Sequence, residues 1–150
     1  MGLAEHITRV WDDEIVDQLR TYITIPNISP AYEDRWHELG HMDRAVALVH
    51  DWCAGRRIAG MTIEVQRLAG RTPLIIIDIP AFGGAPADRT VLLYGHLDKQ
   101  PEMKGWFEGF GPWIPLRKDD KLYGRGGADD GYAMYASLCA LKALAEQKVP

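Results

Sequence analysis

A nearly continuous run of branched apolar residues, Leu74–Ile79, constrains the fold of this chain more than any other stretch. Only Asp78 interrupts the run, so a strand at this position would be apolar on both faces. Strands of that kind are typical of α/β sheets, where helices cover both faces of the sheet. A second short apolar run, Val91–Tyr94, predicts a further buried strand.

The remaining elements follow from the spacing of apolar residues along the chain. Three stretches place them at helical intervals, which predicts helices over residues 3–24, 33–55 and 132–148. Residues 61–68 alternate between apolar and polar side chains, which indicates a half-buried strand. This strand could pair with Leu74–Ile79 as a hairpin.

The segment before the last predicted helix is rich in glycine, proline and tryptophan. Residues 99–120 are therefore predicted to form a long loop, and Leu122 and Tyr123 a short strand after it. A chain of 150 residues is long enough for one domain with a substantial core. We predict an α/β fold with a mixed central β-sheet flanked by helices.

Composition excludes several classes of partner. The net charge is −4 and lysine and arginine do not cluster, which argues against a nucleic-acid-binding surface. No apolar stretch approaches the roughly 18 residues of a membrane helix, and the N-terminus lacks the pattern of a signal peptide. Cys53 and Cys139 lie in helical patterns, so we expect two buried, reduced thiols. These features together favour a cytoplasmic location without a membrane partner.

A histidine and a carboxylate follow the second apolar run. His96 and Asp98 stand two residues apart, so both side chains point to the same side of an extended chain. A metal-bound histidine normally donates its other ring N–H to a carboxylate or a carbonyl group. His96 as a ligand and Asp98 as its partner fit that arrangement, although such a pair alone is more typical of a hydrogen-bonded structural histidine.

Two adjacent carboxylates, Asp129 and Asp130, follow a glycine-rich turn at the predicted start of the last helix. Helix capping accounts for one aspartate at such a position but less well for two. Neighbouring carboxylates repel each other unless a cation or hydrogen-bond donors hold them. The glycines allow the backbone to approach a ligand closely. The two segments together predict half of a metal site.

A second pair of histidines, His37 and His41, has the i, i+4 spacing at which two imidazoles can share a metal on a helix. No acidic residue completes a pattern such as H-E-x-x-H. The pair is therefore more typical of surface histidines on a polar helix than of a metal site.

The two carboxylate-bearing segments resemble a known family. Tyr94–Pro101 reads Y-G-H-L-D-K-Q-P, Trp106 follows, and Lys121–Asp130 reads K-L-Y-G-R-G-G-A-D-D. Order and spacing are similar to those of the co-catalytic dizinc metallopeptidases, which include carnosinase and other cytosolic dipeptidases, glutamate carboxypeptidase, aminoacylase, acetylornithine deacetylase and succinyl-diaminopimelate desuccinylase. The form G-H-L-D-x-Q-P resembles the dipeptidase branch most.

The resemblance implies a role for each matching residue. His96 would bind one zinc ion, Asp98 would be the catalytic partner that orients His96, and Asp129 would bridge two zinc ions before a cis peptide bond to Asp130. Manganese or cobalt could replace zinc. The metals would act as Lewis acids in hydrolysis of a peptide amide bond, in a dipeptide or at a C-terminus.

The chain departs from the family pattern in two places and in its extent. Lys99 replaces a usual apolar residue, and Gly131 stands where a lysine commonly follows the aspartates. The remaining acidic and histidine ligands of the family have no counterpart after Asp130. The resemblance therefore implies that residues 1–150 are the N-terminal part of a catalytic domain, without its remainder and its lid or dimerisation domain. Such a fragment would be inactive alone, and the full-length protein would be a homodimer.

Two other functions remain compatible with the sequence. An N-acyl amino acid deacylase, acting as a deacetylase or a desuccinylase, would use the same amide hydrolysis on a different small substrate. A non-catalytic binding module would account for the incomplete set of metal ligands without any hydrolysis.

Overall fold

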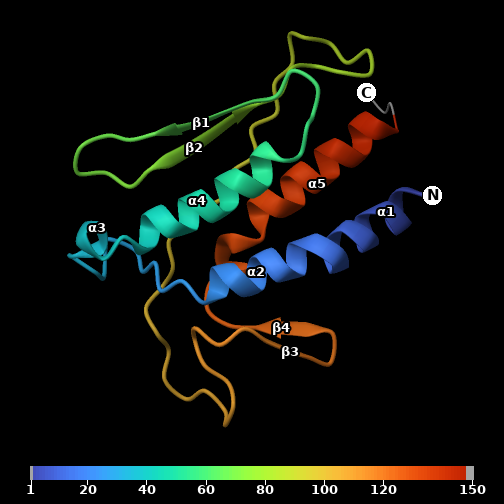
Figure 1. Ribbon diagram of the computed structural model, residues 1–150. Helices are drawn as coiled ribbons and strands as arrows, with labels where there is room; N and C mark the ends of the chain where they lie inside the picture. The colour runs from blue at the N-terminus through green and yellow to red at the C-terminus, as the bar shows by residue number, and fades with distance from the viewer. Residues whose placement is uncertain (1, 148–150) are drawn as a thin grey trace.

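A computed structural model describes residues 2–147 of the chain (Figure 1). Its helices are α1 (Leu3–Val10), α2 (Val16–Ile23), α3 (Trp36–Leu39), α4 (His41–Ala54) and α5 (Ala133–Glu146). Its strands are β1 (Thr62–Gln66), β2 (Leu74–Asp78), β3 (Leu116–Lys118) and β4 (Lys121–Tyr123). The α/β class predicted from the sequence is confirmed.

The N-terminal helix runs through α1 and α2 with a wider π-helical turn, Trp11–Ile15, between them. The predicted helix over residues 3–24 is therefore confirmed. Its buried residues lie in the second half, where Leu19 and Tyr22 face the core.

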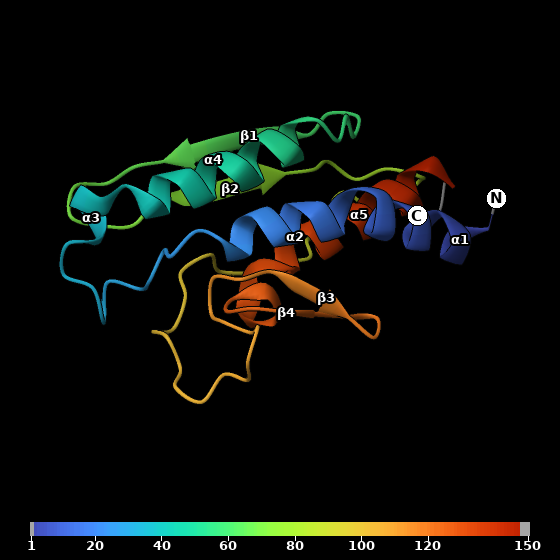
Figure 2. The ribbon, with the colours of Figure 1, turned by 60° about the horizontal axis from the view of Figure 1, so that its bottom comes forward.

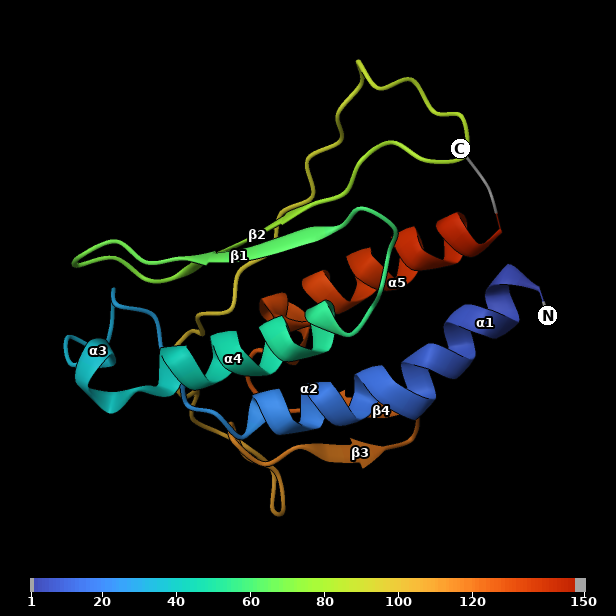
Figure 3. The same cartoon turned by 45° about the horizontal axis from the view of Figure 1, so that its top comes forward.

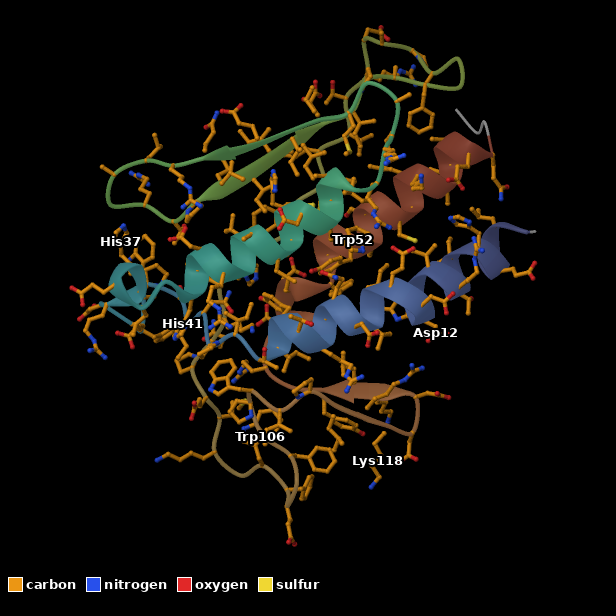
Figure 4. All side chains as sticks on the ribbon, viewed as in Figure 1. Asp12, His37, His41, Trp52, Trp106 and Lys118 are labelled. Carbon is orange, nitrogen blue, oxygen red and sulfur yellow. The ribbon has the colours of Figure 1, made fainter. Side chains whose placement is uncertain are left out.

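The prediction of a single helix over residues 33–55 is wrong for the first part of that range. α3 is a single short turn, and Gly40 separates it from α4 with a left-handed backbone at φ 65°. Glycine adopts this conformation at little cost because it has no Cβ, so the chain changes direction there. His37 and His41 consequently belong to two different helices, α3 and α4 (Figure 4).

The β1–β2 pair forms the predicted antiparallel hairpin, with Thr62 opposite Asp78 and Gln66 opposite Leu74. The prediction that β2 is covered on both faces is wrong for this structure, because Leu74 and Ile76 remain exposed on one face. β3 and β4 form a second antiparallel hairpin, so the predicted loop over residues 99–120 ends in a strand.

The segment Val91–Tyr94 is not a buried strand. Among residues 2–147 it pairs with no strand, and the side chain of Leu92 is 90% exposed. An apolar pattern indicates that a segment can be buried, whereas a ladder of hydrogen bonds also needs a neighbouring strand. The described strands form two separate two-stranded sheets, and the single mixed central sheet is absent from this part of the chain.

The helices form a layer between the two hairpins (Figures 2 and 3). β1 and β2 lie along α4, and β3 and β4 lie on the other side, next to α2 (Figure 1). The main core cluster joins α2, α4 and α5 and contains Ile15, Leu19, Val49, Trp52, Cys53, Ile58, Tyr135, Leu138 and Cys139. Both cysteines are free and buried, as predicted.

The helix predicted over residues 132–148 is confirmed as α5 up to Glu146, and residue 148 lies outside the described residues. α5 follows directly after the turn that carries Asp129, so its packing against α4 helps to fix the position of that turn. The layered helices therefore hold both segments that the sequence predicts to bind metal.

Candidate metal centre

The end of α2 holds the segment that carries His96 and Asp98. The backbone amide of Lys99 donates a hydrogen bond to the carbonyl oxygen of Asn27 at 3.0 Å. The backbone amide of Ser29 donates a hydrogen bond to the carbonyl oxygen of Lys99 at 2.9 Å. The Tyr22 hydroxyl and the Asn27 side-chain amide both donate to the Leu97 carbonyl oxygen at 2.5 Å. This segment is thus fixed to the chain that leaves α2, even though Val91–Tyr94 before it is unpaired.

The His96 ring lies between two carboxylates. Its Nδ1 atom is 3.1 Å from Oδ1 of Asp98 and 3.1 Å from the backbone carbonyl oxygen of the same residue. Its Nε2 atom is 3.3 Å from Oδ1 of Asp129. The structure therefore brings together the three predicted site residues, and Asp98 occupies the position from which it can fix the tautomer of His96.

Asp130 contributes a contact that the sequence did not predict. Its Oδ2 atom accepts a hydrogen bond from the His96 backbone amide at 3.3 Å. The peptide bond between Asp129 and Asp130 is cis, as the family resemblance implies. The two adjacent carboxylates thus have different surroundings, with Asp129 at the His96 ring and Asp130 at the His96 backbone.

The electrostatics of the site favour a cation. Partial burial acts to lower the pKa of His96, but the hydrogen bond to the Asp98 backbone and the nearby carboxylate charges outweigh it and raise the pKa overall. The carboxylates responsible belong to Asp98, Asp129 and Asp130. Three carboxylates around one imidazole concentrate negative charge, and a protonated ring or a bound metal ion would balance it.

The donor atoms fit part of a zinc site. Imidazole nitrogen and carboxylate oxygen are both ordinary zinc ligands, and two donors in a tetrahedral zinc site lie about 3.4 Å apart. The Nε2 and Oδ1 atoms of His96 and Asp129 are 3.3 Å apart. Over residues 2–147, however, no three histidine, cysteine or acidic side chains converge on one point. The described residues therefore offer two candidate ligands, His96 and Asp129, fewer than a tetrahedral zinc site requires.

A hollow of about 260 Å³ borders the site. His96, Asp98 and Asp130 contribute to its wall, and Met42 and Met134 line its apolar side. Small-molecule sites commonly combine such an apolar wall with a few polar groups. The other candidate pair, His37 and His41, does not form a site, since Gly40 places the two residues on different helices.

Lys99 is the site neighbour whose role the sequence analysis missed. Its side chain is 1% exposed, and its Nζ atom donates to the carbonyl oxygens of Tyr22 and Ile25, both at 2.7 Å. Burial lowers the pKa of Lys99 to about 7. A lysine at a position where the family usually has an apolar residue was a visible signal, but its partners lie more than seventy residues earlier in the chain.

Comparisons with known proteins show which proteins this chain resembles. Residues 92–150 match the peptidase family M20/M25/M40. The chain is 31% identical over 146 residues to human Beta-Ala-His dipeptidase, an alignment that covers 92% of this chain and 28% of that protein. The chain is therefore similar to members of this peptidase family over part of their length. It is also 50% identical over 129 residues to a Cys-Gly metallodipeptidase of Candida albicans, covering 78% of this chain and 25% of the relative.

A solved structure shows the same similarity. The crystal structure of human carnosine dipeptidase 1 superposes with a TM-score of 0.65 at 25% identity, and the match covers 100% of this chain and 32% of that chain. The chain therefore spans about a quarter to a third of the length of these M20/M25/M40 relatives. Among residues 2–147, no helix has both the length and the apolarity needed to cross a membrane.

Proposed function

We propose that this protein is a metal-dependent dipeptidase of the M20/M25/M40 family. The observation that carries the proposal is the His96 ring, which has Asp98 at Nδ1 and Asp129 at Nε2. These residues lie within the range that matches the family. The dipeptide substrate rests on the relatives named as dipeptidases.

In the proposed enzyme each residue has a separate task. His96 and Asp129 would hold the metal, which we propose to be zinc, through Nε2 and Oδ1. Asp98 would keep the proton on Nδ1, so that the lone pair of Nε2 points towards Asp129. Asp130 would hold the His96 backbone through the 3.3 Å hydrogen bond. A bound metal supplies Lewis acidity to an amide carbonyl, and manganese or cobalt could serve in place of zinc.

A substrate panel tests the proposal. The intact protein is incubated with zinc, manganese or cobalt, and turnover of dipeptides is compared with that of N-acetyl and N-succinyl amino acids. Faster cleavage of dipeptides supports the proposal. Faster cleavage of N-acyl amino acids would assign a deacylase, and no cleavage of either class would leave a non-catalytic binding module as the better interpretation.

The proposed assembly and location need their own experiments. The homodimer implied by the family resemblance stays a prediction, and light scattering on the intact protein would measure its mass. The cytoplasmic location also stays a prediction, and cell fractionation with an antibody against the protein would test it.

A further inference from the structure

Two residues contact both of the segments that carry the proposed metal ligands. The side chains of Tyr22 and Lys99 are fully buried and in contact, with Lys99 Nζ 3.9 Å from the centre of the Tyr22 ring. The Tyr22 hydroxyl donates a hydrogen bond to the carbonyl oxygen of Leu97, the residue after His96. On their other side the two residues contact the turn that carries Asp129.

The first contact with that turn is between Lys99 and Gly126. Gly126 has φ 84°, and a Cβ on it would lie 2.5 Å from Cε of Lys99 and less than 3 Å from two further carbons of the same side chain. The backbone of Gly126 therefore rests directly on the aliphatic part of Lys99. Gly126 stands at the start of the turn, and its carbonyl oxygen accepts a hydrogen bond from the Gly131 amide at 2.9 Å.

The second contact is between Tyr22 and Gly131, at the end of the same turn. A Cβ on Gly131 would collide with the Tyr22 ring, so the backbone packs against that ring. The turn is thus supported at its start by Lys99 and at its end by Tyr22, with Asp129 between the two supports. The end of α2 supports Lys99 in turn, because two backbone carbonyl oxygens there accept hydrogen bonds from Nζ.

We propose that Lys99 is a positioning residue that sets the separation between His96 and Asp129. Its backbone belongs to the His96 segment, and its aliphatic side chain is the surface on which the Asp129 turn rests. A shorter side chain would let the turn sink towards α2, and the 3.3 Å spacing of the two ligands would change. The inference rests on the proposed function for its consequence, which is metal binding.

Two substitutions at Lys99 separate its aliphatic part from its hydrogen bonds. Lys99→Ala removes the surface beneath Gly126. Lys99→Met keeps an unbranched chain of similar length and loses only the amino group, with its two hydrogen bonds and its contact with the Tyr22 ring. Zinc affinity is measured by calorimetry on the intact protein with zinc chloride, at a temperature where each variant is folded. We expect Lys99→Ala to weaken zinc binding by about 10- to 100-fold, the usual effect of changing a residue that supports a metal ligand.

Lys99→Met is expected to restore most of the zinc affinity that Lys99→Ala loses. The matched control is Val49→Ala, a fully buried position on α4 in the main core cluster, and it should lower stability without changing zinc affinity. Zinc binding by Lys99→Ala as tight as that of the parent would overturn the proposal. Equal losses in Lys99→Ala and Lys99→Met would also overturn it, since the amino group and not the aliphatic chain would then be responsible.

A second measurement does not depend on metal binding or on hydrolysis. Amide hydrogen exchange at Gly131 reports whether the turn stays closed, and amides in the middle of α4 provide the reference. We expect Lys99→Ala to speed exchange at Gly131 more than in α4, and Lys99→Met to speed it little. A change of equal size at both places would contradict the proposal even if the protein proves not to hydrolyse peptides.

If Lys99→Ala does not fold, Gly126→Ala tests the same contact by changing Gly126 instead of Lys99. Its added Cβ would lift the turn off Lys99 and weaken zinc binding. Unchanged zinc affinity in this variant would overturn the proposal.

Discussion

At the scale of single residues, the proposed site depends on which atom of His96 each carboxylate contacts. Asp129 lies at the ring nitrogen that would bind metal, whereas Asp98 lies at the other ring nitrogen. The two residues should therefore respond differently to substitution, although both carry the same functional group.

Loss of a proposed ligand should abolish hydrolysis. We expect His96→Ala and Asp129→Ala in the intact protein to lose all measurable dipeptidase activity, because each removes a donor to the metal. Steady-state assays at saturating zinc measure the loss. Glu146→Gln is a suitable control, because Glu146 lies on α5 and contacts Lys142 instead of the site. Wild-type turnover by either ligand variant would contradict the assignment.

Asp98→Asn should have a smaller effect than loss of a ligand. The amide can still occupy the site but no longer fixes the tautomer of His96, and such changes cost about 10- to 100-fold in affinity or activity. Zinc titration together with turnover measurements tests this expectation. Unchanged values for both would refute the role of Asp98.

Lys99 should make stability depend on pH. Its pKa is lowered to about 7 in the folded protein from 10.5. Between these values the unfolded chain binds more protons, so the free energy of unfolding rises with pH, by up to about 1.4 kcal/mol per pH unit from this group. Below about pH 7 both states are protonated and the dependence ends.

The comparison of wild type with Lys99→Met isolates this effect from other titrating groups. Urea unfolding at pH 7, 8 and 9 should show wild type gaining stability relative to the variant as pH rises. A constant difference across this range would mean that Lys99 has an ordinary pKa in the folded state.

The buried thiols give a simpler prediction. Burial raises the pKa of Cys53 to about 12 and also raises that of Cys139. Alkylation needs the thiolate, so both cysteines should resist iodoacetamide in the native protein and react in urea. Mass spectrometry after labelling distinguishes the two states, and rapid native labelling would contradict the burial.

At the scale of elements, local patterns predicted helices and hairpins well and predicted interruptions poorly. The helix over residues 3–24 and the β1–β2 hairpin follow from side-chain spacing, because each buries one face. Gly40 was missed, since a single glycine inside a helical pattern does not reveal that its backbone is left-handed. Val91–Tyr94 was wrongly predicted as a strand, because strand pairing depends on a neighbouring strand that the local sequence does not identify.

The break at Gly40 should therefore be sensitive to a side chain. Gly40→Ala places a Cβ on a residue with φ 65°, which we expect to destabilise the fold by about 1 kcal/mol. Thermal unfolding measures the change, and Gly2→Ala, at a position with φ −73°, is the control. A more stable Gly40→Ala variant would indicate that α3 and α4 can join into one helix.

At the scale of the whole molecule, the sequence predicted which segments meet at the site but not what holds them apart. Spacing and chemistry singled out His96, Asp98 and the adjacent pair Asp129 and Asp130, and the family resemblance assigned the proposed metal role to Asp129. The contacts of Lys99 with Tyr22 and Gly126 could not be found in this way, because they depend on how α2 packs against two distant segments. These supporting contacts are thus determined by tertiary packing, which sequence motifs do not specify.

A chain limited to residues 1–150 should bind zinc weakly and self-associate. Two proposed ligands are fewer than zinc requires. Val91–Tyr94 has exposed apolar side chains and no partner strand within residues 2–147. Calorimetry should show zinc affinity weaker than micromolar, and light scattering should show association that Leu92→Lys reduces. Tight zinc binding by a monodisperse monomer would contradict both expectations.

The packing of Tyr22 beneath both segments also bears on how the protein folds. The hydrogen bond from Tyr22 to Leu97 joins residues 75 positions apart, and that from Lys99 to Tyr22 joins residues 77 positions apart. Contacts of such long range require closure of large loops, which slows folding. During synthesis α2 leaves the ribosome long before its partners, because the N-terminus is made first. The proposed metal site should therefore form late in folding, after the helices have assembled.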